Sequence, residues 1–333
     1  METIRVSIVL CTYNGEHYLA QQLDTLLRQT YPIHEIIVQD DHSTDNTVGI
    51  LEDYAVRYSC IKLFRNERHG GINANFFSAM RRAEGDVIAI SDQDDLWEPT
   101  KIERQIAFLG DHLLCACRSM PFADDGAPVG YDSRRPDVHL IRLLYSSIPG
   151  HTMLFRRRLL DMLPKPDDSL RTYYDVYLGL TAAANDGLVL LDEVLVHQRR
   201  HANAATYAVV DTRRRPSAAN GLYILFYSLW NFRRVHPYQC AYFQRRLRLM
   251  QGIHTVTGSA ASLCEEGRLF DEALRIVRLQ SQEGILPFLQ LFRLHIRHRH
   301  HLFYTEGHGF LNFCRAALYP IMQTYNYRYL ANP

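Results

Sequence analysis

Long apolar runs are missing from this chain of 333 residues. No stretch approaches the ~18 consecutive apolar residues of a membrane-spanning helix. The run Leu222 to Trp230 is among the longest, but it is too short and contains polar residues. The apolar segment Val6 to Cys11 is too short for the core of a secretory signal peptide, and no cleavage site follows it. We therefore expect a cytoplasmic protein.

Paired cysteines and glycine-rich phosphate loops are also missing. The seven cysteines are scattered and form no CxxC pair, which predicts reduced, buried thiols rather than a zinc site or a disulfide framework. Neither GxGxxG nor GxxxxGK[ST] occurs. The first loop after a predicted strand reads CTYNG instead. A glycine cradle for phosphate is thus excluded.

Lysine is absent from residues 212–333, where all 16 basic residues are arginine and only 6 residues are acidic. The net charge of +1 therefore hides −9 in residues 1–211 and +10 in residues 212–333. Such an asymmetry indicates two separate tasks. We expect one domain at residues 1–210 and a basic, mainly helical region at residues 211–333, with a hinge at Arg213–Pro216.

The first 110 residues alternate strand and helix patterns. Short apolar runs bounded by turn residues predict buried strands at Val6–Leu10, Glu35–Gln39, Ile61–Arg65 and Asp86–Ser91. A helical pattern lies between the first two strands, and Ser43 to Asp45 could cap a second helix that runs to about residue 58. This alternation predicts an α/β fold with a doubly wound, mostly parallel sheet.

Later elements are shorter. We expect a strand at Thr152–Phe155, a helix at Asp175–Ala184, and two short strands at Leu188–Leu191 and Val194–Gln198. Beyond the hinge only helical patterns follow, at residues 222–235, 238–255, 262–280 and 286–303.

Acidic residues follow the predicted strands. Asp40, Asp41 and Asp45 come after the second strand, and Asp92 and Asp94 come after the fourth. In a parallel sheet, ligands bind beyond the carboxyl ends of the strands. One carboxylate could accept a hydrogen bond from a nucleotide base, and a pair of carboxylates suits a hard divalent cation that also needs phosphate oxygens. The alternative is a solvated turn and a helix cap.

Three segments together carry a family resemblance: SIVLCTYNGEHYLAQQLDTLLRQT, EIIVQDDHSTDNT and GDVIAISDQDDLW. They strongly resemble the family 2 glycosyltransferases, which have the GT-A fold, and the resemblance covers roughly residues 3–205. The details SDQDDLW, GHTMLF and RHAN look most like the rhamnosyltransferase-type subgroup of bacterial surface-polysaccharide synthesis. The resemblance implies an inverting, metal-dependent transferase that moves a sugar from a nucleoside-diphosphate sugar, dTDP-rhamnose or a UDP-sugar, to a glycan or lipid-linked glycan.

The same resemblance implies roles for particular residues. Binding of the donor nucleotide falls to Thr12, Tyr13, Asn14, Asp41 and Asp92. A divalent metal, Mg²⁺ or Mn²⁺, would be held by Asp94, the last Asp of the DxD, and by His201. The acceptor side would comprise His151, Asp95 and Trp97, and Asp175 would be the catalytic base. One departure is that Tyr174 stands before this base, where the subgroup often has His or Glu.

Two other functions stay open at this point. A nucleotidyltransferase shares the sheet and the acidic strand ends but needs a Gly-rich signature with Lys or Arg near the first strand, which CTYNGEHYL lacks. A catalytically inactive nucleotide-sugar-binding homologue would not need an intact DxD and Asp175.

The arginine-rich tail carries no nucleic-acid-binding motif. A basic amphipathic segment that does not span the bilayer suits an anionic membrane surface, and a lipid-linked acceptor would agree with that. The alternative is a helical bundle with an Arg-rich solvent face. We therefore expect a protein that is cytoplasmic or peripheral on the inner face of the cell membrane.

Overall fold

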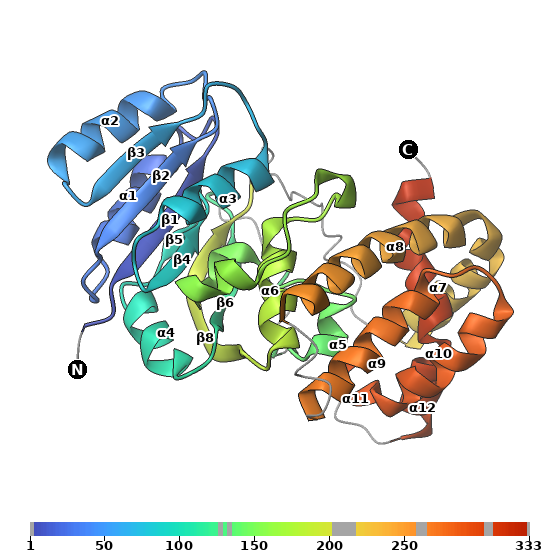
Figure 1. The fold of residues 1–333 in the computed structure, drawn as a ribbon. Coiled ribbons are helices and arrows are strands. Elements are labelled where there is room, and N and C mark those ends of the chain that lie inside the picture. The colour runs from blue at the N-terminus through green and yellow to red at the C-terminus, as the bar shows by residue number, and fades with distance from the viewer. Residues whose placement is uncertain are drawn as a thin grey trace. The chain divides into compact units, whose positions relative to one another are not determined.

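The computed structural model describes residues 3–125, 129–131, 135–201, 218–257, 265–302 and 309–331 (Figure 1). Contacts divide the chain into two units. The first comprises Met1–Ser133, Ser147–Leu163 and Tyr173–Val210, and the second comprises Arg134–Ser146, Pro164–Thr172 and Asp211–Pro333. The expected boundary at 210/211 and the expected hinge at 213–216 lie outside the described residues and stay predictions.

The first unit is built on an eight-stranded sheet of order β3-β2-β1-β4-β7-β6-β8-β5. Its strands are β1 (Val6–Thr12), β2 (Glu35–Asp40), β3 (Ile61–Arg65), β4 (Val87–Ser91), β5 (Leu96–Trp97), β6 (Leu114–Phe122), β7 (Met153–Arg156) and β8 (Leu188–Arg199). The first four are parallel, whereas β7 runs antiparallel to β4 and β6. The expected doubly wound, mostly parallel sheet is confirmed for this part.

Helices cover the sheet and bury its central strands on both faces. They are α1 (Leu19–Leu27), α2 (Thr47–Arg57), α3 (Ile72–Arg82), α4 (Lys101–Leu109) and α6 (Tyr174–Ala184). Every residue of β1, β2 and β4 is buried, as expected for parallel strands with helices on both sides. Helix α2 begins later than expected: its cap residue is Asn46, and the Asp45 carboxylate accepts from the Thr47 N–H at 3.0 Å.

The two short strands expected at residues 188–198 form one strand, β8. The acidic pair Asp192 and Glu193, which suggested a turn, instead lies in an irregularity of the pairing with β6. Register shifts flank Arg118, which contacts Asp192, while Arg104 contacts Glu193. Arg118 on β6 and Arg104 on α4 therefore hold the acidic pair in extended backbone where the local sequence favours a break.

The second unit is helical, as expected. Its helices are α5 (Leu140–Leu143), α7 (Ala218–Trp230), α8 (Phe232–Thr257), α9 (Glu265–Gln280), α10 (Ile285–Arg297), α11 (Arg299–Leu302) and α12 (Phe310–Met322), with a 3₁₀ segment at Gln323–Ala331. The break expected before residue 238 is wrong, because α8 runs through Pro237 and the chain breaks at Asn231 instead. Pro237 is the sixth residue of α8, so the helix lacks one backbone N–H donor there and nevertheless continues. In the described part of the chain, no helix is both long enough and apolar enough to cross a bilayer.

Candidate active site

The register of the sheet brings the three acidic loops to one edge. Strand β1 pairs with β2 at Cys11↔Gln39 and with β4 at Leu10↔Ser91, so all three strands end within a residue or two of one another. The loops that begin at Tyr13, Asp41 and Asp92 therefore start side by side. Sequence spacing predicted this convergence.

The first two loops are hydrogen-bonded to each other. Asn14 lies in a left-handed conformation with φ 47°, and its side-chain oxygen accepts from the Thr44 N–H at 2.8 Å. The Asn14 N–H in turn donates to the Ser43 Oγ at 2.9 Å. Thr12 is buried, and its hydroxyl donates to Asp40 at 2.9 Å. The side chains of Thr12 and Asn14 thus hold the loops in place, and any nucleotide would meet the surface they shape.

The middle residue of the DxD ties the third loop to the first. The Gln93 side chain accepts from the Tyr13 N–H at 2.8 Å and donates to the Tyr13 carbonyl at 3.0 Å. A Cβ on Gly15 would lie 2.3 Å from the Gln93 Oε1, so a side chain at this position would displace the Gln93 amide from Tyr13. Sequence analysis assigned no role to Gln93 or Gly15, because neither residue type indicates such a contact by itself.

Asp41 is buried, and its carboxylate already has four neighbouring donors. Oδ1 accepts from the Asn66 side chain at 2.7 Å and from the Gly70 N–H at 2.8 Å, while Oδ2 accepts from the Gly71 N–H at 2.8 Å. His69 Nδ1 lies 2.9 Å from Oδ2. An ionised carboxylate offers about four acceptor sites. A base N–H could therefore reach Asp41 only if one of these donors moved.

Tyr13 presents an accessible ring at the same place. Its side chain is exposed, and its ring centroid lies 4.4 Å from that of His69 at an interplanar angle of 36°. Aromatic faces of this kind stack on nucleotide bases. His69 was not among the expected site residues, since its sequence neighbourhood gives no hint that it meets both Tyr13 and Asp41.

Asp94 and His201 meet although 107 positions separate them. His201 Nε2 lies 2.8 Å from Asp94 Oδ2, and both side chains are largely but not fully buried. Burial and the charge of Asp92 raise the pKa of Asp94, while His201 opposes that rise. Arg199 donates to the Asp94 carbonyl at 2.9 Å and packs over the Tyr18 ring. Of the rest of the RHAN motif, the Arg200 N–H donates to the Phe122 carbonyl at 2.8 Å, and Ala202 and Asn203 lie outside the described residues.

A second group lies beside this pair. His151 Nδ1 is 3.3 Å from Asp92 Oδ2 and 3.6 Å from Asp95 Oδ2, and the three residues could together hold a metal ion. Burial and the charges of Asp92 and Asp94 raise the pKa of Asp95 to about 7, although His151 opposes the rise. Burial alone would lower the pKa of His151, but Asp95 and Asp92 outweigh it and raise that pKa. Both effects fit a proton shared inside the group.

Asp175 stands in the first turn of α6 and is partly exposed. Its Oδ1 accepts from the Val176 N–H at 2.8 Å. The preceding Tyr174 is buried, its ring stacks on Phe76 at a centroid distance of 4.0 Å, and its N–H donates to Asn73 at 2.9 Å. Burial raises the pKa of the Tyr174 phenol, and the charges of Asp92 and Asp175 add to it. These two carboxylates therefore both lie near Tyr174.

Trp97 is only 3% exposed and belongs to the apolar core of the sheet. The Lys101 ammonium lies 3.8 Å from the ring centroid of Trp97 and donates to Gln105 at 2.8 Å. The Trp97 ring, which we expected on the acceptor side, is therefore part of the core that supports the loop beginning at Asp92.

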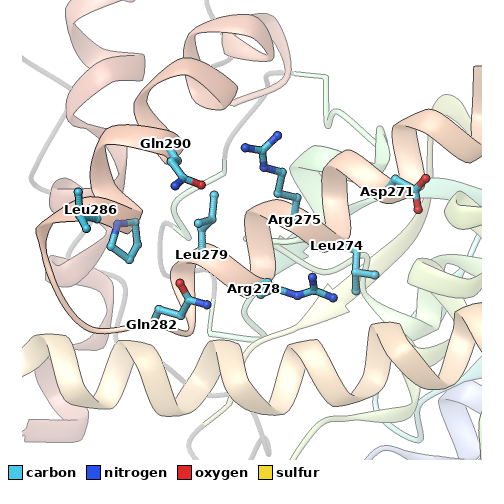
Figure 2. A pocket seen from close by; sticks show the side chains of 9 residues that line it. Asp271, Leu274, Arg275, Arg278, Leu279, Gln282, Leu286 and Gln290 are labelled. Carbon is cyan, nitrogen blue, oxygen red and sulfur yellow. The ribbon is translucent and has the colours of Figure 1, made fainter.

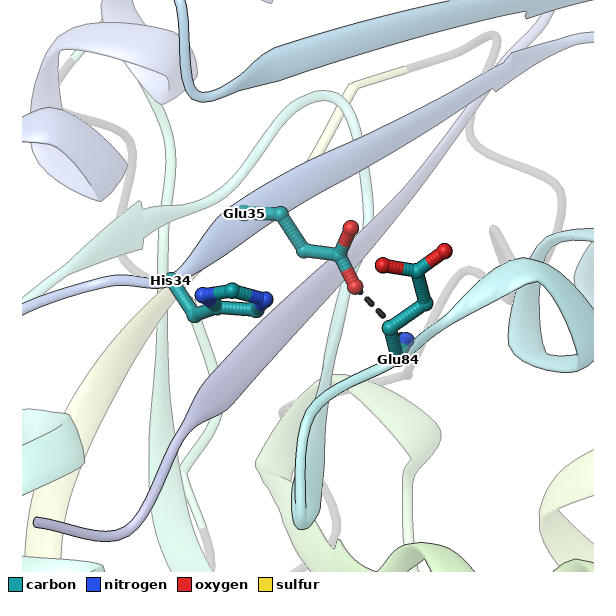
Figure 3. A group of neighbouring side chains, drawn as sticks. All are labelled: His34, Glu35 and Glu84. Atoms are coloured by element: carbon teal, nitrogen blue, oxygen red, sulfur yellow. Dashed lines mark hydrogen bonds between the residues drawn. The ribbon is translucent and has the colours of Figure 1, made fainter.

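Another metal-capable group lies at the opposite end of β2. It comprises His34, Glu35 and Glu84 (Figure 3). The buried Glu35 carboxylate accepts from the Glu84 N–H at 2.7 Å, and the Lys62 ammonium lies 2.7 Å away. Lys62 therefore already supplies a cation, and this group is remote from the loops described above.

Comparisons agree with the class of fold that this sheet defines, an α/β fold of GT-A type. Residues 7–163 match the model of the Glycosyl transferase family 2. The crystal structure of Staphylococcus aureus TarS 1–349 in complex with UDP covers 99% of this chain, and the chain covers 92% of it, with a TM-score of 0.55 and 18% identity. The expected GT-A fold with a helical C-terminal region is confirmed.

The relatives found by sequence comparison match shorter segments of this chain. An uncharacterized protein of Mycobacterium tuberculosis is 30% identical over 63% of this chain and 63% of its own length. The Escherichia coli enzyme WfgD, a UDP-Glc:α-D-GlcNAc-diphosphoundecaprenol β-1,3-glucosyltransferase, is 37% identical over 33% of this chain and 42% of its own length. The chain thus spans less than two thirds of the length of these relatives. The resemblance to family 2 is supported, and the rhamnosyltransferase-type subgroup stays a prediction.

Proposed function

We propose that this protein is an inverting, metal-dependent glycosyltransferase of surface-polysaccharide synthesis. It transfers a sugar from a nucleoside-diphosphate sugar, with dTDP-rhamnose or a UDP-sugar as the favoured donor, to a hydroxyl of a glycan or lipid-linked glycan. The observation that carries the proposal is the contact of Asp94 with His201 beside Asp92, at the edge where β1, β2 and β4 end.

Asp94 and His201 are the residues we propose as metal ligands. A carboxylate oxygen and an imidazole nitrogen 2.8 Å apart form a suitable donor pair for Mn²⁺ or Mg²⁺, and the pair keeps some solvent access. That access leaves coordination positions for phosphate oxygens. In the group of Asp92, Asp95 and His151, two of the three residues are almost inaccessible, so it fits a supporting role better. A divalent ion here would neutralise the charge that develops on the leaving diphosphate.

The protein side of the reaction follows from the other residues. The Tyr13 ring offers a stacking surface for the base, next to the loop that Asp41 anchors. Asp175 would take the proton of the acceptor hydroxyl while the sugar carbon forms its new bond and the bond to the diphosphate breaks. Attack from the face opposite the leaving group inverts the configuration. Tyr174, which packs between α3 and the edge, fixes the start of α6 and hence the position of Asp175.

The test measures nucleotide release with UDP-, GDP- and dTDP-sugars, with and without Mg²⁺ or Mn²⁺. We expect Asp94→Ala and His201→Ala to lose metal-dependent release and metal-dependent nucleotide binding while the fold is kept. The matched control is Asp53→Ala, an exposed aspartate on α2. Undiminished turnover in EDTA would refute the metal role.

The two rival functions give different outcomes. A nucleotidyltransferase would release pyrophosphate from a nucleoside triphosphate and a sugar phosphate. An inactive binding homologue would bind the nucleotide sugar but would not split it, so the assay would detect no nucleotide release.

A further inference from the structure

Helix α7 in the second unit has large apolar side chains outside and a polar side chain inside. The 13-residue helix contains no charged residue, and the one described side chain that it buries fully is Ser228. Trp230 is 90% exposed and Phe226 is 67% exposed, and the same surface carries Leu222, Tyr223 and Leu229. Ile224, Leu225 and Tyr227 are half-buried, so α7 is apolar on its outer as well as its inner side, whereas a surface helix of a soluble bundle has a polar outer side.

Helices α10 and α12 have ordinary buried apolar residues, Leu291 and Leu294 on α10 and Ala316 and Tyr319 on α12, but they too bury a polar residue and expose large apolar ones. On α10, His295 is fully buried while Leu286, Leu289 and Phe292 are exposed. On α12, Asn312 is buried while Phe310 and Phe313 are exposed. All three helices therefore expose large apolar side chains while they bury a polar one.

The three helices are neighbours, and exposed residues of α10 and α12 contact each other. Helix α12 contacts both α7 and α10, and the rings of Phe292 and Phe313 lie 6.3 Å apart. We call their exposed apolar residues together the outer apolar face: Leu222, Tyr223, Phe226, Leu229, Trp230, Leu286, Leu289, Phe292, Phe310 and Phe313. Exposed apolar surface of this extent marks an interaction site.

Several polar groups of the interior are paired with each other. The Tyr145 hydroxyl lies 2.6 Å from His295 Nε2 and accepts from Gln280 at 3.3 Å, and the Gln280 side chain accepts from Gln239 at 2.9 Å. Burial lowers the pKa of His295 to about 3, so this imidazole is neutral near pH 7. Buried hydrogen bonds thus stabilise these polar side chains in the interior, while aromatic side chains remain exposed on the surface.

The charged residues of the three helices favour an anionic partner for the face. Helices α7, α10 and α12 contain no Asp or Glu, and their charged residues are Arg293, Arg297 and Arg315. Arg297 is already paired with Glu272, but two such faces docked on one another would still bring Arg293 and Arg315 close to like charges. An anionic lipid surface provides apolar chains and negative phosphates at once.

A pocket beside the face adds to this argument. It has a volume of about 530 Å³ and lies where α9 meets the start of α10 (Figure 2). Arg275 and Arg278 line it together with Leu279 and Leu286, and Asp271 lies at one end. Within the described residues, no ion pair joins either guanidinium to a carboxylate. Leu286 belongs both to the pocket and to the outer apolar face, so a lipid phosphate in the pocket would have its chains beside the face.

We propose that the outer apolar face docks on an anionic lipid bilayer, with the Arg275–Arg278 pocket taking a lipid phosphate. This rests on the proposed function, because a lipid-linked acceptor would lie in that bilayer. Tryptophan and tyrosine on an amphipathic helix favour the headgroup region, and arginine side chains reach the phosphates from there.

The experiment uses the full-length protein with vesicles of phosphatidylcholine and phosphatidylglycerol, and with vesicles of phosphatidylcholine alone. We expect cosedimentation with the anionic vesicles, weakened by salt. The chain has only two tryptophans, and Trp97 is buried, so a blue shift of emission on binding reports Trp230. Trp230→Phe should abolish the shift.

The double variant Phe226→Ser/Trp230→Ser should partition roughly tenfold more weakly or worse, because it removes two large apolar groups from the face. Phe108→Ser is the matched control, since Phe108 is an exposed aromatic residue of α4 in the first unit and should change nothing. Arg275→Gln/Arg278→Gln should reduce binding to the anionic vesicles only.

Three results would overturn the proposal. The wild-type protein could ignore anionic vesicles at low salt, the double variant could bind as the wild type does, or sedimentation could show a dimer that the double variant disrupts. Donor hydrolysis without lipid separates this proposal from the proposed function. The variants of the face should retain donor hydrolysis. A protein that binds vesicles but never releases nucleotide would refute only the proposed glycosyltransferase function.

Discussion

Gly150 has a neighbour that leaves no room for a side chain, and this gives a sharp test of the candidate site. The residue opens the 3₁₀ turn Gly150–Thr152, which carries His151. A Cβ at position 150 would lie 2.1 Å from the Tyr174 hydroxyl oxygen and 2.7 Å from its Cζ. The Tyr174 ring is 5% exposed and stacked on Phe76, so it cannot retreat into solvent.

Gly150→Ala should therefore lower the free energy of unfolding of the first unit by about 1–3 kcal/mol, the usual cost of overpacking. Tyr174→Ala by itself should cost about 3–5 kcal/mol, because it empties a buried aromatic site. In the Tyr174→Ala background, however, Gly150→Ala should cost less than about 0.5 kcal/mol. The double-mutant cycle then yields a coupling of about 1–3 kcal/mol.

Urea unfolding followed by tryptophan fluorescence provides the measurement. In a Trp230→Phe background only Trp97 reports, and it lies in the core of the first unit. Gly179→Ala is the control, because its added Cβ would meet only Met153 Cε at 4.0 Å, an ordinary contact. The reasoning fails if Gly150→Ala unfolds at the wild-type urea concentration, or if it costs the same with and without the Tyr174 ring.

Three further predictions concern single residues. Asp175→Asn should fold and bind donor nucleotide yet transfer sugar roughly 10²- to 10⁴-fold more slowly; transfer at the wild-type rate would move the base elsewhere. His295→Gln should reduce the loss of stability at acid pH. The pKa of His295 is about 3 in the folded chain and 6.5 as its ordinary value, so the wild type is fully stable above pH 6.5 and should lose roughly 3 kcal/mol between pH 7 and pH 4. Urea unfolding at both pH values would detect this loss in the wild type and its reduction in the variant. Lys101→Met should remove a rise in stability between pH 8 and 10.5, because burial lowers the pKa of Lys101 to about 8 and the unfolded chain binds more protons in that window; an unchanged pH profile would show that Lys101 titrates normally.

Local pattern was sufficient for the framework of the first unit. Four expected strands appear at or within a residue or two of their expected bounds, since short apolar runs between turn residues carry their own signal. The pattern misled at β8, where the Asp192–Glu193 pair looks like a turn but is held extended by Arg118 and Arg104. Those partners come from distant segments, so no window around residue 192 contains them.

The candidate site shows the same division. Sequence alone placed acidic loops at strand ends, and the parallel register then made Asp92 and Asp94 converge with the Tyr13 loop. It did not reveal that the Asp41 carboxylate is surrounded by four donors, or that Gln93 clasps the Tyr13 backbone. Residue types and spacings follow from the chain, but hydrogen-bond partners depend on which loops become neighbours.

The helical unit makes the point most clearly. Composition showed that residues 212–333 are rich in arginine and free of lysine, and the sequence pattern predicted that this region is mainly helical. Which side of α7 faces outward was decided only by packing, because this helix is apolar almost all round and its sequence favours no face. Burying Ser228, His295 and Asn312 leaves Trp230 and Phe310 outside. That choice follows from long-range contacts between helices, which the amino-acid pattern within a single helix does not encode.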